Sequence, residues 1–95
     1  MALLSDAEIL KRIAPLKGWE VANREIKKKF TFDSFMSAIA FINRVAPTAE
    51  AADHHPDILI NYKRVTLTLS THSEGGITEK DFALAGEIEK LVPHA

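Results

Sequence analysis

The sequence at residues 57–71 is DILINYKRVTLTLST, in which two β-prone runs flank a polar segment near Tyr62, Lys63 and Arg64. In the second run apolar and polar residues alternate, as in a strand with one buried face and one wet face. The apolar set is Val65, Leu67 and Leu69, and the polar set is Thr66, Thr68, Ser70 and His72. A strand of this kind is typical of an antiparallel sheet that packs on one side only. The stretch therefore predicts a pair of antiparallel strands, with His72 at the end of the second strand on its polar face.

A second pair of strands is predicted between residues 19 and 32. Trp19 and Val21, with Asn23 at the limit of the strand, share one face, and the chain turns near Asn23 and Arg24. In the following strand the inward set is Ile26, Lys28, Phe30 and Phe32, and the outward set is Lys27, Lys29 and Thr31. The net charge of the chain is -1, so the KKK run at residues 27–29 indicates a solvated sheet face rather than a nucleic-acid patch.

Two helices carry capping-box patterns, in which a side chain accepts from a first-turn amide and an acid reaches back. Ser5 and Glu8 begin a first helix that should run to about Ala14, before Pro15 and Gly18. After a turn at residues 75–76, Thr78 and Asp81 begin the last helix. Its predicted apolar face consists of Phe82, Ala85, Ile88 and Leu91.

A helix is also predicted between the two strand pairs. Asp33 or Ser34 can cap it. The predicted apolar stripe consists of Phe35, Ile39, Ile42 and Val45 or Ala46. Pro47 interrupts this pattern, so we expect a kinked or re-started helix that ends at about Ala52.

The element order is therefore α-β-β-α-β-β-α. The prediction is an α+β fold, a four-stranded antiparallel sheet with three helices packed on one face. A chain of 95 residues buries roughly 60–70% of its unfolded surface, enough for one core. We expect a single domain over residues 1–95.

Composition narrows the function classes. The chain is 46% hydrophobic and 26% charged, which is typical of a soluble globule with no long-range attraction to polyanions. It contains no cysteine, so thiolate chemistry and disulfides are excluded. With no secretory signal pattern and no apolar run of roughly 20 residues, we expect a cytoplasmic protein that binds neither nucleic acid nor a membrane directly.

Histidines and acids gather where the predicted elements end, which is where scaffolds present functional groups. They are His54, His55, His72, Glu50, Asp53, Asp57 and Asp81, whereas His94 lies in the C-terminal tail and is expected to be idle. Pro56 biases His55 towards extended geometry, and adjacent extended residues project to opposite sides. A zinc site shared by His54 and His55 is therefore disfavoured, and we predict no metal.

Nucleophilic catalysis is also disfavoured. Ser70, Thr71 and Ser73 flank His72, but the sequence contains no G-x-S-x-G elbow. Proton transfer fits better, because an imidazole with an unperturbed pKa of about 6.5 both gives and takes a proton near neutrality. Elimination of water from a carbinolamine suits such a site, because the adjacent nitrogen expels the hydroxyl once that oxygen is protonated.

The spacing of these residues resembles a known signature. Glu50 is followed after three residues by His54-His55-Pro56, after five more by Tyr62, after nine by His72 and after eight by Asp81. This pattern resembles that of the pterin-4a-carbinolamine dehydratase family. The resemblance extends to GW at 18–19, FTFDSFMSAIAFINRVA at 30–46 and THSEGGITEKDFALA at 71–85, and so covers nearly the whole chain.

The resemblance implies the same fold and a defined chemistry. Family members dehydrate 4a-hydroxytetrahydropterins, products of aromatic amino-acid hydroxylases, to quinonoid dihydropterins in the recycling of tetrahydrobiopterin, without a metal or another cofactor. The implied catalytic residues are His54, His55 and His72. The implied substrate-binding residues are Glu50, His54, His55, Pro56, Thr71, His72, Ser73, Glu74 and Asp81.

Individual roles follow from the same comparison. We expect His54 and His72 to act jointly as acid and base, and His55 mainly to bind. If the helix persists, Glu50 lies one turn before His54 and supports it. Asp81 is expected either to cap its helix or to bond on the ligand side, and Tyr62 to pack in the core.

Partners are implied in the same way. Family members form homodimers or homotetramers, and an aromatic amino-acid hydroxylase would be a functional partner. The rival hypothesis is a non-enzymatic protein-binding member, either a dimerisation cofactor for a transcription factor or an assembly factor. The presence of all three histidines favours the enzyme.

Overall fold

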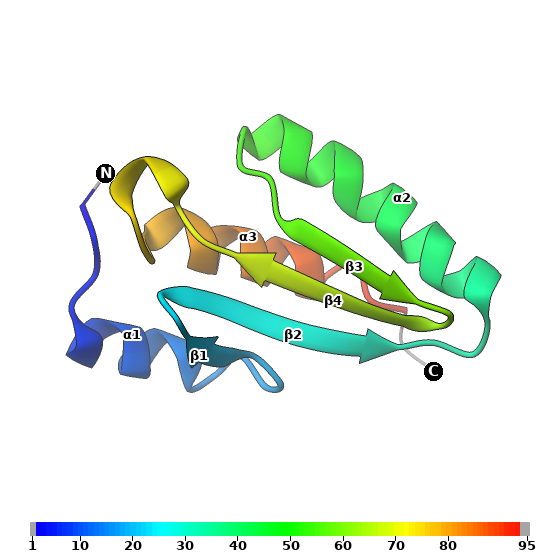
Figure 1. Cartoon of the computed structure of the whole chain (residues 1–95), viewed down its shortest axis with the longest axis horizontal. Helices are drawn as coiled ribbons and strands as arrows, with labels where there is room; N and C mark the ends of the chain where they lie inside the picture. Colours follow the sequence, from blue (N-terminus) through cyan, green and yellow to red (C-terminus); the bar gives the residue numbers. More distant parts are fainter. Residues whose placement is uncertain (1, 94–95) are drawn as a thin grey trace.

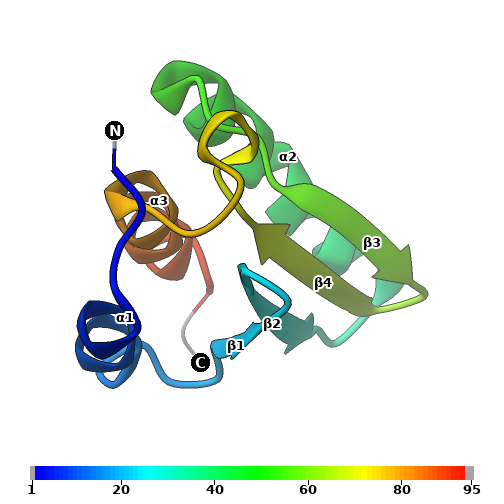
Figure 2. The same cartoon turned by 60° about the vertical axis from the view of Figure 1, so that its left-hand side comes forward.

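A four-stranded antiparallel sheet and three helices make up residues 2–93, the part of the chain that the computed structural model describes (Figure 1). In chain order the elements are α1 (Asp6–Ile13), β1 (Glu20–Ala22), β2 (Glu25–Thr31), α2 (Phe35–Ala52), β3 (Asp57–Asn61), β4 (Arg64–Leu69), the 3-10 turn η1 (His72–Glu74) and α3 (Glu79–Glu89). The predicted order is confirmed, with the helices on one side of the sheet (Figure 2). His94 lies outside the described residues.

The sheet has the strand order β1-β2-β4-β3, so β2 and β4 are central and β1 and β3 are edges. In the central pair Ile26 lies opposite Leu69 and Phe30 opposite Val65. Asp57, at the start of β3, lies opposite Thr68, near the end of β4. This register brings the segment before β3 and the segment after β4 to the same end of the sheet.

The two tight turns use left-handed backbone. Asn23 and Arg24 have φ values of 53° and 62°, the conformation of the two-residue turns that match strand twist. Tyr62 has a φ of 55° and is 62% exposed. The prediction that Tyr62 packs in the core was therefore wrong, because the residue lies in the β3-β4 turn and not within a strand.

The core lies between the sheet and the helices. Phe41 of α2 is fully buried, with its ring centroid 5.0 Å from that of Phe30 and 4.9 Å from that of Phe32. The buried residues of α2 are Ala38, Phe41, Val45 and Ala49. This face is displaced from the predicted stripe, since Phe35 is 46% exposed and Ile39 and Ile42 are half-buried. The apolar residues of α2 lie on more than one face, so spacing alone did not fix its orientation.

Helix α2 ends as predicted but is not re-started at Pro47. It runs from Phe35 to Ala52 with Pro47 inside. Asp53 then takes a left-handed conformation, with a φ of 51°, and its N–H donates to the carbonyls of Ala49 and Glu50. This cap reverses the chain direction just before the two histidines.

Lys28 lies on the helix side of β2, as the alternation predicts. Its Nζ is 2.9 Å from Oε2 of Glu89, which also accepts a hydrogen bond of 3.0 Å from Nε1 of Trp19. This contact joins α3 to β2. No helix within residues 2–93 has the length and apolar character needed to cross a membrane.

Candidate active site

The candidate site lies at the end of the sheet where β3 begins and β4 ends. The loop at residues 53–56 and the turn η1 both lie there (Figure 1). The first residue of α3's capping box, Thr78, follows η1 closely in the chain. The end of α2 with the loop after it, η1 with the residue before it, and the start of α3 thus supply the predicted site residues.

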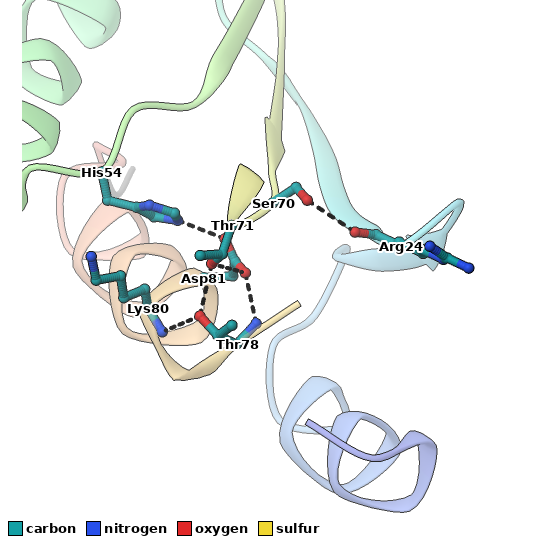
Figure 3. A network of polar contacts seen from close by, with 7 residues as sticks. All are labelled: Arg24, His54, Ser70, Thr71, Thr78, Lys80 and Asp81. Atoms are coloured by element: carbon teal, nitrogen blue, oxygen red, sulfur yellow. Dashed lines mark hydrogen bonds and ion pairs between the residues drawn. The ribbon is translucent and has the colours of Figure 1, made fainter. Parts of the chain in front are cut away.

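His54 is held almost completely inside the protein. Its backbone N–H donates to the carbonyl of Ala49, which continues the reversal begun at Asp53. The side chain is only 10% exposed, and its Nε2 is 2.6 Å from Oδ1 of Asp81. Figure 3 shows the imidazole pointing towards Asp81. The contact joins the end of α2 to the start of α3.

Asp81 is fully buried and is surrounded by hydrogen-bond donors. Its Oδ2 accepts from Oγ1 of Thr71 and from the backbone N–H of Thr78, both at 2.9 Å. Both contacts to Oδ2 are donated by the partner, and Oδ1 faces Nε2 of His54. Asp81 caps α3 as predicted, and its burial excludes direct contact with a ligand in this conformation.

The tautomer of neutral His54 follows from this arrangement. Since a carboxylate only accepts, Nε2 of His54 carries the hydrogen and Nδ1 carries the lone pair. Nδ1 makes no hydrogen bond to any described residue, and within residues 2–93 no buried side-chain nitrogen or oxygen lacks a partner. Nδ1 is therefore not fully enclosed, and the small exposed part of His54 lines a cavity.

A cavity of about 570 Å³ opens beside His54 between α2 and α3. Its lining includes Pro47, Ala51, Ala52, His54, Lys80 and Leu84. Cavities of this volume with mostly apolar walls and a few polar groups are typical of small-molecule sites. Lys80 was not among the predicted site residues, and only its position beside Asp81 in the sequence could have indicated it.

His55 differs from His54 in both its hydrogen-bond partner and its exposure to solvent. Its Nε2 is 2.6 Å from Oε1 of Glu50, and these side chains are 59% and 78% exposed. The expectation that Glu50 supports His54 was wrong, because the left-handed Asp53 ends the helix before His54 can lie one turn above Glu50. His55, Glu50 and Pro56 line a second cavity of about 410 Å³.

His72 lies on η1 rather than at the end of a strand, because β4 stops at Leu69. Its side chain is exposed and makes no hydrogen bond within the described part of the chain. Ser73 and Glu74 on the same turn are also exposed. The two cavities that contain His54 and His55 do not include His72, so the three histidines share one end of the fold without sharing one cavity.

Thr71 faces the protein interior. It is 3% exposed, and its Oγ1 lies 2.7 Å from Oγ1 of Thr78 as well as bonding Asp81. In this conformation its hydroxyl is turned to Thr78 and Asp81, and the prediction that Thr71 binds the substrate stays a prediction. Thr78 was predicted only as a helix cap, and its second role at the site was missed because it depends on a contact between distant segments.

The arrangement offers protons and proton acceptors at one end of the sheet. His54 has an unpaired Nδ1 and a buried carboxylate behind it, whereas the His72 side chain is exposed on the surface. Within residues 2–93 no three histidine, aspartate or glutamate side chains are grouped so as to hold a metal ion.

A family model, curated relatives and solved structures are all similar to this chain. Residues 2–91 match the model of the family described as pterin 4 alpha carbinolamine dehydratase. A protein of Roseiflexus castenholzii that is provisionally named a pterin-4-alpha-carbinolamine dehydratase is 55% identical over 91 residues, covering 96% of this chain and 98% of the relative.

Two solved structures are also similar. A transcriptional coactivator/pterin dehydratase from Brucella melitensis has a TM-score of 0.91 at 35% identity, covering 95% of this chain and 98% of that one. A pterin dehydratase-like protein identified as a RuBisCO assembly factor in the alpha-carboxysome has a TM-score of 0.64 at 24% identity, covering 77% and 84%. The second likeness concerns the fold alone.

Proposed function

The chain belongs to the pterin-4a-carbinolamine dehydratase family, and we propose that it converts 4a-hydroxytetrahydropterin to quinonoid dihydropterin and water. The C4a–O bond breaks and the C4a=N5 double bond forms. The electron pair left when N5 loses its proton expels the hydroxyl, which takes up a proton and leaves as water. The atoms and electrons balance without a redox partner, so the reaction requires one base and one acid.

The observation that carries this proposal is the His54–Asp81 pair, with Nε2 and Oδ1 2.6 Å apart. The hydrogen on Nε2 is donated to Asp81, so His54 can accept a proton only at Nδ1. A base held in one tautomer by a buried carboxylate needs no rearrangement when it accepts a proton. We assign removal of the N5 proton to His54.

The exposed His72 is the proposed acid. It lies on a short turn at the same end of the sheet, and its imidazole is not tied to another described side chain. It can therefore approach the leaving hydroxyl of a bound pterin. His55, held by Glu50 at 2.6 Å, is the proposed binding residue together with Pro56, Ser73 and Glu74.

We also propose that the chain forms a homodimer or homotetramer. The edge strand β3 exposes Ile58 and Leu59, which are 41% and 57% exposed, and α2 exposes Phe35 and Met36. Unpaired strand edges with apolar side chains favour pairing with another chain. An aromatic amino-acid hydroxylase is the kind of enzyme that would supply the substrate, and the product would return to tetrahydrobiopterin.

The rival proposal is a binding protein without enzymatic activity. The similar Brucella melitensis protein carries both descriptions, coactivator and dehydratase, so the two roles are compatible in principle. The preorganised His54–Asp81 pair favours the enzyme, because a purely structural surface has no need for an accessible, oriented imidazole.

Stopped-flow absorbance of quinonoid dihydropterin formation distinguishes the hypotheses when it is measured on histidine variants. His54→Ala and His72→Ala should each lower kcat by about 10²–10⁴-fold, whereas His55→Ala should mainly raise KM. Folding of each variant is checked by circular dichroism. Wild-type kcat in both of the first two variants would remove the proposed mechanism.

A further inference from the structure

We propose that Thr71 and Thr78 are positioning residues that act on His54 through Asp81. This inference rests on the proposed function for its kinetic consequence, but the arrangement itself can be tested without activity. The two threonines belong to different segments, since Thr71 precedes η1 and Thr78 caps α3. Both are buried, at 3% and 0% exposure.

The direction of every hydrogen bond in this group is fixed by counting hydrogens. A threonine hydroxyl has one hydrogen to give. Thr71 gives its hydrogen to Oδ2 of Asp81, so in the 2.7 Å contact between the hydroxyls the donor is Thr78. The hydroxyl of Thr78 in turn accepts from the backbone N–H of Lys80.

The bonds therefore run one way, from a first-turn amide of α3 through Thr78 and Thr71 to Asp81 (Figure 3). At its other oxygen Asp81 accepts from His54. Donors from α3 and the β4–η1 segment thus hold the carboxylate in one orientation, with Oδ1 turned to Nε2. Aligned hydrogen bonds of this kind also polarise one another.

The orientation of Asp81 determines which ring nitrogen of His54 carries the lone pair. If Thr71 could not donate, Oδ2 would retain only the Thr78 amide, and the carboxylate could rotate away from His54. The imidazole would then populate more than one orientation and tautomer, and fewer molecules would present Nδ1 to the substrate. Thr71 would influence turnover without touching the pterin.

Three threonine variants test this inference. Thr71→Val removes the hydroxyl at nearly constant shape, Thr71→Ser keeps it, and Thr68→Val makes the same change in β4 away from the network. We expect Thr71→Val to lower kcat by about tenfold with little change in KM, and Thr71→Ser and Thr68→Val to remain within roughly threefold of wild type.

A readout independent of turnover is the ¹H–¹⁵N spectrum of the His54 ring. Wild-type protein and Thr71→Ser should show a single Nε2–H tautomer with a slowly exchanging hydrogen, and Thr71→Val should show mixed tautomers or faster exchange. This result would support the inference even if the chain had no dehydratase activity.

The inference is overturned if folded Thr71→Val keeps both the wild-type kcat and the wild-type ring spectrum, even if that variant is less stable. If Thr71→Val does not fold, Thr78→Val is compared with Thr78→Ser by the same two measurements, since only Thr78→Val removes the donor to Thr71. Equal kcat and equal spectra in that pair would overturn it as well.

Discussion

Replacing Asp81 by asparagine is the most informative single change at this site. An asparagine has nearly the same shape but offers one acceptor oxygen and one donor NH₂ group. Its oxygen can occupy the position of Oδ2, where it still accepts from Thr71 and from the Thr78 amide. Its NH₂ group then faces His54. The opposite orientation would set NH₂ against two donors and is disfavoured.

The magnitude follows from the bonds that change. The variant keeps two of the three bonds to Asp81 and loses the charged character of the His54 contact, 2.6 Å long in the wild type. A buried hydrogen bond to a charged group contributes about 1.5–3 kcal/mol, and a neutral bond replaces part of it. We expect the free energy of unfolding to fall by about 1–2 kcal/mol, so the protein should still fold.

The effect on turnover should be much larger. The asparagine NH₂ donates to Nε2, which moves the ring hydrogen of His54 to Nδ1 and removes the accessible lone pair. Loss of a correctly oriented base lowers kcat by about 10²–10⁴-fold. The assay is stopped-flow kcat, together with urea unfolding and the ¹H–¹⁵N spectrum of His54, which should show the Nδ1–H tautomer.

The matched change at the exposed pair is Glu50→Gln, which alters the partner of His55 in the same chemical way. A kcat for Asp81→Asn within roughly threefold of wild type, in a protein whose His54 tautomer has moved to Nδ1–H, would refute the assignment of His54 as base. An unchanged tautomer would instead refute the hydrogen-bond geometry.

Three further changes are predicted. Glu50→Gln should change the free energy of unfolding by less than about 0.5 kcal/mol, because exposed ion pairs contribute little, and urea unfolding checks this; a loss above roughly 1 kcal/mol would show a stronger pair. Lys28→Met should lower that free energy by about 1 kcal/mol, because it removes the half-buried contact with Glu89, and should leave kcat unchanged; a variant as stable as wild type would contradict this. Leu59→Lys puts a charge on the exposed edge strand β3 and should reduce the molecular mass measured by light scattering. Leu10→Lys makes the same change at an exposed leucine of α1 and should leave the mass unchanged. An unchanged mass for Leu59→Lys would count against assembly through β3.

Features set by local chemistry were predictable from the sequence. The alternation in β2 and β4 gave the strands and their faces, including the inward position of Lys28, because successive side chains in a strand point to opposite sides. The capping patterns located the starts of α1 and α3, with the full capping box formed at α3 and only the Ser5 cap at α1, because such caps depend on residues three apart.

Features that depend on one backbone conformation were not predictable. The left-handed Asp53 gives Glu50 to His55 instead of His54, and no residue type requires that conformation at this position. The buried face of α2 was also misjudged, because Phe41 packs between Phe30 and Phe32 while other apolar residues of the helix lie outside. The 3-10 turn after β4 placed His72 on the surface.

Contacts between segments far apart in the chain were also not predictable from the sequence. The sequence placed His54, Thr71 and Asp81 near the ends of elements, yet the pairing of His54 with Asp81 and of Thr71 with Thr78 needs the sheet register and the position of α3. Spacing therefore identified the participants at the site, and only the folded chain shows which of them touch.

The central claim is that this chain accelerates loss of water from a pterin carbinolamine. The direct measurement is stopped-flow formation of quinonoid dihydropterin from a 4a-hydroxytetrahydropterin, with the rate compared in the presence and absence of catalytic amounts of wild-type protein. We predict acceleration over the spontaneous reaction that is proportional to protein concentration and is lost in His54→Ala. A rate equal to the spontaneous one at every protein concentration would contradict the claim and favour a binding protein.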